Sequence, residues 1–166
     1  MDPFTNLPAR IDSLPQAQSL EFRKVDRRYA PMAVLTTVLF LLIPLAVGCT
    51  IAGFAESFAR AMQVLAGGVV IIALIGAITW MHARSYAVAL REHDVALRKG
   101  WIWTKTIFVV LTRVQHVEVS RGPFERRAGL STLKVFTSGG AQSDLTIPGL
   151  TADIAERLRQ QIAGAE

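Results

Sequence analysis

Two long stretches of this chain carry no charged side chain. They cover residues 29–55 and 61–81, and both consist mainly of apolar residues. About 20 helical residues cross roughly 30 Å of hydrocarbon, so each stretch is long enough to span a bilayer. A buried pair of core helices is the alternative, but core helices rarely run this long without a charge. The sequence therefore predicts a transmembrane hairpin over 29–82, with spans at about 30–55 and 61–81.

The short connection between the two spans fixes their arrangement. Residues 56–60 are too few to cross the membrane again, so both outer ends of the hairpin lie on the same side. Lys and Arg gather on the cytoplasmic side of membrane helices. The connection carries Arg60, whereas cations flank both outer ends, namely Arg23, Lys24, Arg27, Arg28, Arg84, Arg91, Arg98 and Lys99. This bias predicts that both termini of a multi-pass protein are cytoplasmic.

The segment before the first span and the spans themselves carry further signals. Residues 1–28 are polar and proline-punctuated, which predicts a cytoplasmic tail and not a cleaved signal peptide. Residues 20–29 are expected to continue the first helix out of the bilayer, and Pro44 is expected to kink it. Small residues at helical spacing predict close helix packing, either within the hairpin or with another molecule; they are Gly48, Ala52, Gly68, Ala73, Gly76 and Ala77.

Composition argues against several chemistries. The formal net charge is +5, but the cations near the bilayer are explained by topology, so nucleic-acid binding is not expected. Cys49 is the single cysteine and lies inside a predicted span, so no intrachain disulfide or thiolate metal cluster forms. His82, His93 and His116 are scattered, and no nucleophile elbow, P-loop or dinucleotide fingerprint occurs. We expect no enzyme, no cofactor and no metal site.

After residue 83 the pattern changes from continuously apolar to alternating, which is typical of strands. The sequence predicts about six or seven antiparallel strands in a cytoplasmic domain over 83–163. Pro148 and Gly149 are expected to end the sheet. The strands are expected at 85–91, 94–105 with a bend at Gly100, 104–111, 115–120, 131–137 and 141–147; turns are expected at 91–94 and 138–140, and a loop or single helical turn at 122–129.

The C-terminal segment has a helical pattern. Thr151 is a suitable cap, and Ile154, Leu158 and Ile162 form one apolar stripe at a spacing of four. A lone helix of this length is marginal in water, so the stripe is expected to dock on the sheet. The predicted architecture is a two-helix membrane hairpin followed by an α+β domain.

Two segments carry a family resemblance. They are "LTRVQHVEVSRGPFERRAGLSTLKVFTSGG" (111–140) and "LTIPGLTADIAERLRQQI" (145–162). Both resemble the bacterial pleckstrin-homology-like family, the membrane-flanked domain of YdbS-like proteins. The resemblance covers roughly residues 20–163. It implies a PH-like, partly open antiparallel β-barrel that a C-terminal helix caps, in the bacterial inner membrane. It also implies a partner membrane protein with several such domains. The family commonly has a proline shortly before the Arg-x-Gln phrase, where this chain has Leu111-Thr112.

Cations and indoles of the sheet domain are candidates for contact with lipid headgroups or a partner. The basic turn after the 115–120 strand is either solvated, a headgroup contact or a contact for an acidic protein face. Two indoles at alternate positions of the 94–105 strand share a face, which is either core or interface. The candidates are Trp101, Trp103, Lys105, Arg113, Arg121, Arg126 and Arg127.

Two functions are therefore open. The first is a non-enzymatic, membrane-anchored module that docks a partner membrane protein, or a second copy of itself, at the cytoplasmic face. The second is a module that binds anionic lipid headgroups.

Overall fold

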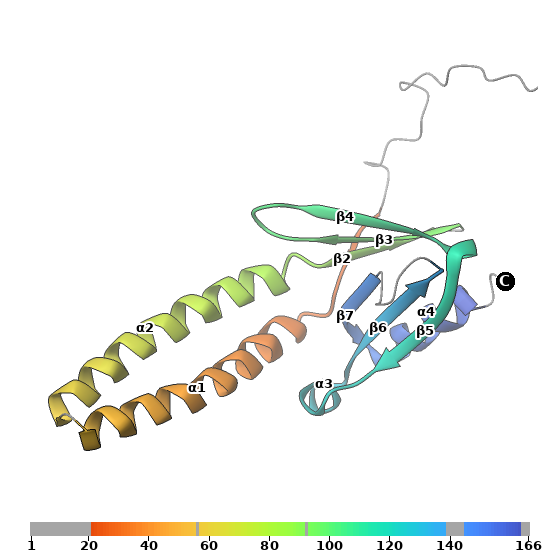
Figure 1. The fold of residues 1–166 in the computed structure, drawn as a ribbon. Helices are drawn as coiled ribbons and strands as arrows, with labels where there is room; N and C mark the ends of the chain where they lie inside the picture. Colours follow the sequence, from red (N-terminus) through yellow and green to blue (C-terminus); the bar gives the residue numbers. More distant parts are fainter. Residues whose placement is uncertain (1–20, 56, 92, 139–144, 164–166) are drawn as a thin grey trace, which may run out of the picture.

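The computed structural model describes residues 21–55, 57–91, 93–138 and 145–163 (Figure 1). Two long antiparallel helices, α1 (Tyr29–Ala55) and α2 (Phe58–Ala83), project from a domain built of strands and two shorter helices. Almost none of the residues in the most apolar part of each helix are buried within the chain; Phe54, for example, is 94% exposed. Helices with this length and an apolar exposed surface suit a lipid environment, as the sequence predicted.

The hairpin is held together by small residues of one helix facing larger residues of the other. A Cβ atom added at Gly68 would lie 2.2 Å from Leu45 Cδ1, so the Leu45 side chain occupies the space that the missing Cβ leaves. Gly48 and Gly76 likewise lie next to Val64 and Val34 of the opposite helix. These three glycines therefore pack the hairpin against itself. α1 continues as one helix through Pro44.

The rest of the chain forms two antiparallel sheets. The first has the order β1-β2-β3-β4 and the second the order β5-β6-β7. The strands of the first are β1 (Arg23–Lys24), β2 (Ala87–Leu90), β3 (Asp94–Lys99) and β4 (Lys105–Val110). A 3-10 turn, η3 (Leu111–Arg113), leads into the second sheet, which consists of β5 (Val114–Ser120), β6 (Leu130–Thr137) and β7 (Leu145–Thr151). α3 (Pro123–Ala128) joins β5 to β6, and α4 (Ala152–Ala163) follows β7.

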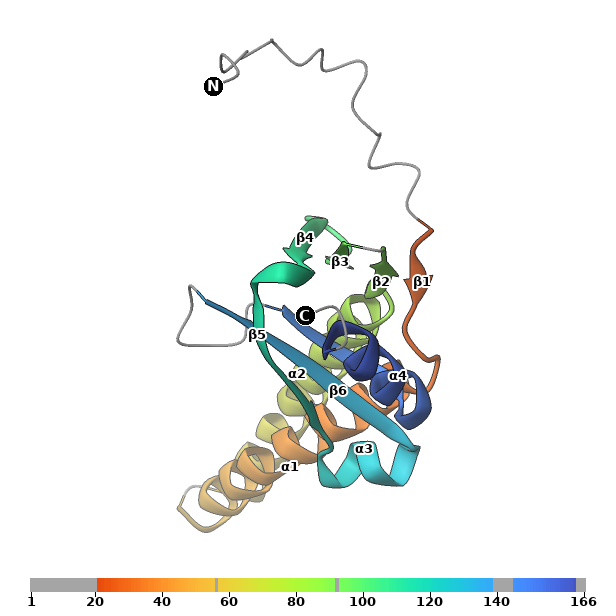
Figure 2. The same cartoon turned by 90° about the vertical axis from the view of Figure 1, so that its right-hand side faces the viewer.

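The core lies between the two sheets and under α4 (Figure 2). Alternate residues of β2–β7 point into it because strand side chains alternate between faces. The fully buried members include Val95 and Leu97 of β3, Leu133 and Val135 of β6, and Leu145 and Ile147 of β7. Two residues of the predicted helix stripe, Leu158 and Ile162, are buried against this core, with Ile154 partly buried beside them. The two sheets and their closing helix confirm the predicted PH-like fold.

The segment before α1 differs from the prediction. Arg23 and Lys24 do not extend the membrane helix; they form β1 and pair with Val88 and Ala87 of β2. The periodicity of this short segment did not reveal the strand, because two residues are too few to show alternation. The chain therefore contributes to the sheet domain both before and after the membrane hairpin.

The end of the second sheet also differs from the prediction. β7 continues through Pro148 and Gly149 to Thr151 instead of stopping before them. Gly149 adopts a left-handed φ of 70°. A register shift between Ser131 and Leu133 of β6 accommodates this stretch, and irregular pairing of this kind tolerates proline and glycine. The predicted turn at 138–140 and strand at 141–147 fall largely on residues 139–144, which lie outside the described residues.

The predicted strand over 94–105 is wrong in its second half. β3 ends at Lys99, and residues 100–104 form the turn to β4. Gly100 has a φ of 99°, and a Cβ atom there would lie 2.2 Å from the carbonyl oxygen of Trp103. Because only glycine fits this geometry readily, the chain reverses at Gly100 instead of bending.

Candidate functional site

An apolar groove lies between the open edges of the two sheets. It has a volume of about 330 Å³. β1 and β2 form one wall, and the end of β7 together with α4 forms the other (Figure 2). Its apolar lining consists of Val25, Val88, Leu90, Leu150, Ile154 and Leu158, and its polar lining includes Glu21, Arg23, Lys24, Asp26 and Thr151.

Backbone hydrogen bonds close one end of this groove. The Asp26 amide donates to the Gly149 carbonyl at 2.9 Å, and the Val25 amide donates to the Tyr86 carbonyl at 3.3 Å. Farther along, β1 pairs with β2 alone in the described sheet, so its other edge faces the groove unpaired. An edge of this kind offers backbone donors and acceptors to an extended peptide.

A second, more polar cleft of about 890 Å³ lies where the hairpin joins the domain. Its cations come from β1, from the turn before α1 and from the end of α2; they are Arg23, Lys24, Arg27 and Arg84. The Arg84 guanidinium lies 5.7 Å from the ring centre of Trp80, which lines the same cleft. Asp26 also lines this cleft, but within the described residues no carboxylate forms an ion pair with these cations. This arrangement suits a phosphate-bearing ligand.

The turn between β3 and β4 exposes its apolar side chains. Trp101, Ile102 and Trp103 are 49%, 67% and 88% exposed. The two indoles are therefore not core residues, which removes one of the two predicted environments. Lys105 opens β4 directly opposite Lys99, at the base of this turn.

The arginines of the basic turn after β5 have different surroundings. Arg121 donates from Nε to the hydroxyl oxygen of buried Ser131 at 2.8 Å. Arg126 and Arg127 instead lie exposed in the last turn of α3. Glu125 fixes the start of this helix by accepting from the Gly122 amide at 2.8 Å. Arg121 is thus tied to β6, whereas Arg126 and Arg127 belong to α3.

Arg113 lies apart from the other candidates. It belongs to η3, beyond the end of β4 that carries Val110, whereas Lys105 lies at the opposite end of the same strand. Six residues of strand at about 3.3 Å each separate the two ends. The structure therefore brings together Trp101, Trp103 and Lys105, and separately Arg126 and Arg127, and it leaves Arg113 at the far end.

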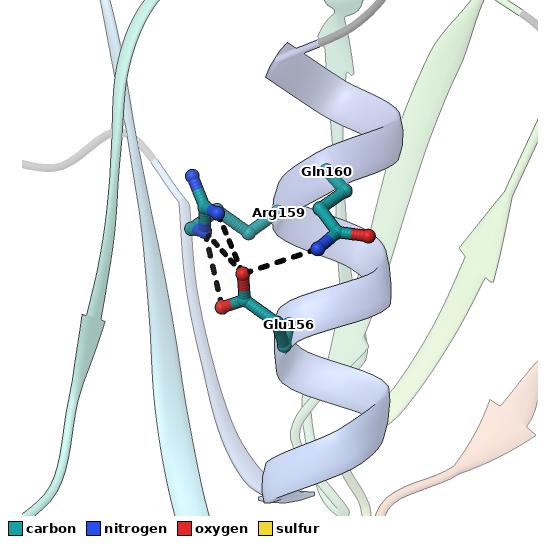
Figure 3. Close-up of polar contacts among 3 residues, drawn as sticks. All are labelled: Glu156, Arg159 and Gln160. Carbon is teal, nitrogen blue, oxygen red and sulfur yellow. Dashed lines mark hydrogen bonds and ion pairs between the residues drawn. The ribbon is translucent and has the colours of Figure 1, made fainter.

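The outer face of α4 carries a polar network (Figure 3). Glu156 accepts from Arg159 Nε at 3.0 Å and from Gln160 Nε2 at 3.4 Å. The hydrogen bond from Arg159 is the main cause of a lowered Glu156 carboxyl pKa, and the Arg121 charge contributes to the same shift. These groups are exposed at the helix surface, and the network stabilises α4 without forming a pocket.

No arrangement for metal binding is present in the described part of the chain, where no three His, Cys, Asp or Glu side chains come together. The chemistry that the described surfaces offer is recognition: an apolar groove with a free strand edge, a cationic cleft and an exposed aromatic turn. Sequence reasoning missed the groove, because the residues of one wall are at least 59 positions away in the chain from those of the other. The cations of the cleft were used in the sequence only to predict which side of the membrane the termini occupy.

Comparisons with known proteins agree with this architecture. The model of the bacterial PH domain matches residues 33–166. The transmembrane protein YdbS of Bacillus subtilis (strain 168) is 34% identical over 74 residues, which cover 45% of this chain and 45% of that protein. The match thus spans less than half the length of this relative. No solved structure matches the chain.

Proposed function

The chain belongs to the bacterial PH domain family, and we propose that it is a non-enzymatic, membrane-anchored module that docks a partner membrane protein at the cytoplasmic face. The membrane hairpin holds the domain at the bilayer, and the domain supplies the docking surface. The partner is either another membrane protein with PH-like domains or a second copy of this chain. The distribution of Lys and Arg supports cytoplasmic termini, which reporter fusions to each terminus test.

The observation that carries this proposal is the groove between β1 and α4. Its walls are mainly apolar, and the free edge of β1 runs along it. An extended segment of a partner gains backbone hydrogen bonds from such an edge and places alternate side chains in the groove. Arg23 and Lys24 at the rim favour a segment in which acidic residues alternate with apolar ones.

Site-specific photo-crosslinking in the native membrane tests this docking. A photoreactive residue replaces Lys24, which is exposed at the groove rim. The matched control places it at Arg113, which is also exposed but lies beyond the end of β4 that is remote from Lys105. We expect a crosslinked membrane protein, or a crosslinked dimer, from position 24 alone. An Ile154→Glu substitution, which introduces a charge into the groove, is expected to abolish it.

Equal crosslinking at the two positions, or none at either, would count against the groove as a docking site. Insensitivity of the product to Ile154→Glu would do the same. A dimer and a heterologous product are both consistent with the proposal, and mass spectrometry of the product distinguishes them.

The cationic cleft favours a second candidate function, the binding of anionic lipid headgroups. Trp80 and Arg84 line it at the domain-proximal end of α2, and each Lys or Arg near an anionic surface adds roughly 1 kcal/mol of attraction. This candidate ranks second because two spans already hold the domain at the membrane. Headgroup binding is therefore not needed for recruitment, although it suits lipid sensing.

Thermal unfolding of the full chain in mild detergent tests the second candidate. Added phosphatidylglycerol is expected to stabilise the protein more than phosphatidylcholine, and salt is expected to weaken the difference. Arg84→Gln removes a cation of the cleft, and Arg157→Gln removes an exposed cation on α4 as the control. The candidate fails if both lipids stabilise equally, or if the two variants respond alike.

A further inference from the structure

The turn between β3 and β4 is apolar where a water-exposed turn would be polar. Its three central residues, Trp101, Ile102 and Trp103, are all exposed in the described structure. Two-residue and longer hairpin turns usually carry glycine, asparagine, aspartate or serine. A turn that presents two indoles and an isoleucine to the outside marks a contact with something apolar.

Hydrogen bonds hold this turn at the end of the second membrane helix. The Gly100 amide donates to Ser85 Oγ at 2.9 Å, and Ser85 Oγ donates to the His82 carbonyl at 2.6 Å. His82 lies in the last turn of α2. The strand register agrees, because Ala87, three residues after Arg84, pairs with Arg98 beside the turn. The turn therefore lies next to the point where α2 leaves the bilayer.

The figures place the turn beside the membrane hairpin. The tip of the β3–β4 hairpin lies over the domain-proximal end of α2 (Figure 1), and α3 contacts α1 on the other side of the membrane hairpin. α3 carries Phe124, which is 37% exposed, together with exposed Arg126 and Arg127. Aromatic and basic side chains thus flank the membrane hairpin on both sides.

The base of the turn carries a pair of like charges. Lys99 and Lys105 are direct partners in the β3–β4 register. Like charges opposite one another destabilise a sheet in water. Anionic phosphates at the base of a turn that enters the bilayer would neutralise this repulsion, and the aliphatic lysine stems would lie along the apolar surface.

We propose that Trp101, Ile102 and Trp103 insert into the interfacial region of the bilayer that the hairpin spans. The turn is a second, non-spanning anchor. Indoles favour this region because their rings are apolar and their N–H groups find polar partners there. The anchor fixes the orientation of the domain relative to the membrane, and it is independent of whether the groove or the cationic cleft binds a ligand.

Fluorescence of the full chain in vesicles tests the insertion. Trp80→Phe leaves the two indoles of the turn as the only tryptophans, since the chain has three. The protein is reconstituted into vesicles of phosphatidylcholine and phosphatidylglycerol, with or without bromine on the acyl chains. We expect blue-shifted emission, strong loss of intensity in brominated vesicles and little quenching by aqueous acrylamide.

A matched variant supplies the reference for an indole in water. It replaces all three tryptophans by phenylalanine and carries Arg113→Trp at the far end of the domain. This variant is expected to show red-shifted emission, quenching by acrylamide and no loss in brominated vesicles. The proposal is overturned if the turn behaves like this reference. It is also overturned if the turn is shielded from acrylamide but not quenched by bromine, because a protein contact would then cover it.

Discussion

The contact between Gly149 and Tyr29 couples the sheet domain to the start of the membrane hairpin, and substitution of Gly149 by alanine measures it. A Cβ atom at Gly149 would lie 2.6 Å from Cβ and Cγ of Tyr29. These atoms are close to the backbone of α1 and cannot move without shifting the helix. The left-handed φ of 70° adds about 1–2 kcal/mol for alanine. Overpacking adds about 1–3 kcal/mol, so we expect a destabilisation of about 2–5 kcal/mol.

Gly129 provides the matched control for this substitution. Its φ of 71° is nearly the same, but no atom lies within 4 Å of an added Cβ. Gly129→Ala is therefore expected to cost only about 1–2 kcal/mol. Urea unfolding of the full chain in mild detergent, followed by near-ultraviolet circular dichroism, compares the two variants. In a Tyr29→Gly background, which lacks both contacting atoms, the excess cost of Gly149→Ala should disappear.

Two results would refute this reasoning. Equal destabilisation by the two alanines would mean that the Tyr29 ring does not pack on Gly149. An excess that persists in the Tyr29→Gly background would assign the cost to the backbone of β7 and not to its contact with the Tyr29 side chain.

Two further predictions concern the hairpin and α4. Gly68→Leu should separate the membrane helices, because the added side chain would overlap Leu45. Gly67→Leu should be tolerated, since nothing lies within 4 Å of a Cβ atom at that position. Cysteine crosslinking between the spans in membranes compares the two variants. The lowered pKa of Glu156 means that its contact with Arg159 stabilises the domain above the ordinary glutamate pKa, near pH 4, and that this contribution is lost as the pH falls through the lowered value. Glu156→Gln should slightly reduce the loss of stability that the protein shows as the pH falls below about 4, measured by acid titration. An unchanged loss would mean that the Glu156–Arg159 pair does not stabilise α4.

The elements with long, regular patterns were predictable from the sequence. The two spans follow from length and the absence of charge, and the spacing of Leu158 and Ile162 predicted that α4 would dock on the sheet. The alternation in β5 and β6 likewise located these strands. Such patterns are visible because many residues of one element share one environment.

The failures occur where only a few residues decide the structure. Trp101 and Trp103 alternate as strand residues do, and the pattern contains no signal of the reversal other than Gly100 itself. β1 consists of two residues, and only its pairing with β2, more than 60 residues later, makes it a strand. The groove and the cationic cleft depend on the same pairing, so they could not be predicted from local patterns.

The pairing of β1 with β2 changes how the membrane anchor acts on the domain. Because β1 precedes α1 and β2 follows α2, the hairpin is inserted between two neighbouring strands of one sheet. Both ends of the hairpin are therefore attached to the domain, whereas a single flexible tether would let the domain rotate. Two contacts strengthen these attachments. The Tyr29 side chain packs on Gly149 before the hairpin, and the Gly100 amide donates to Ser85 Oγ after it. A domain held in this way presents fixed faces to the bilayer and to its neighbours, which a docking module requires and a freely tethered domain does not provide.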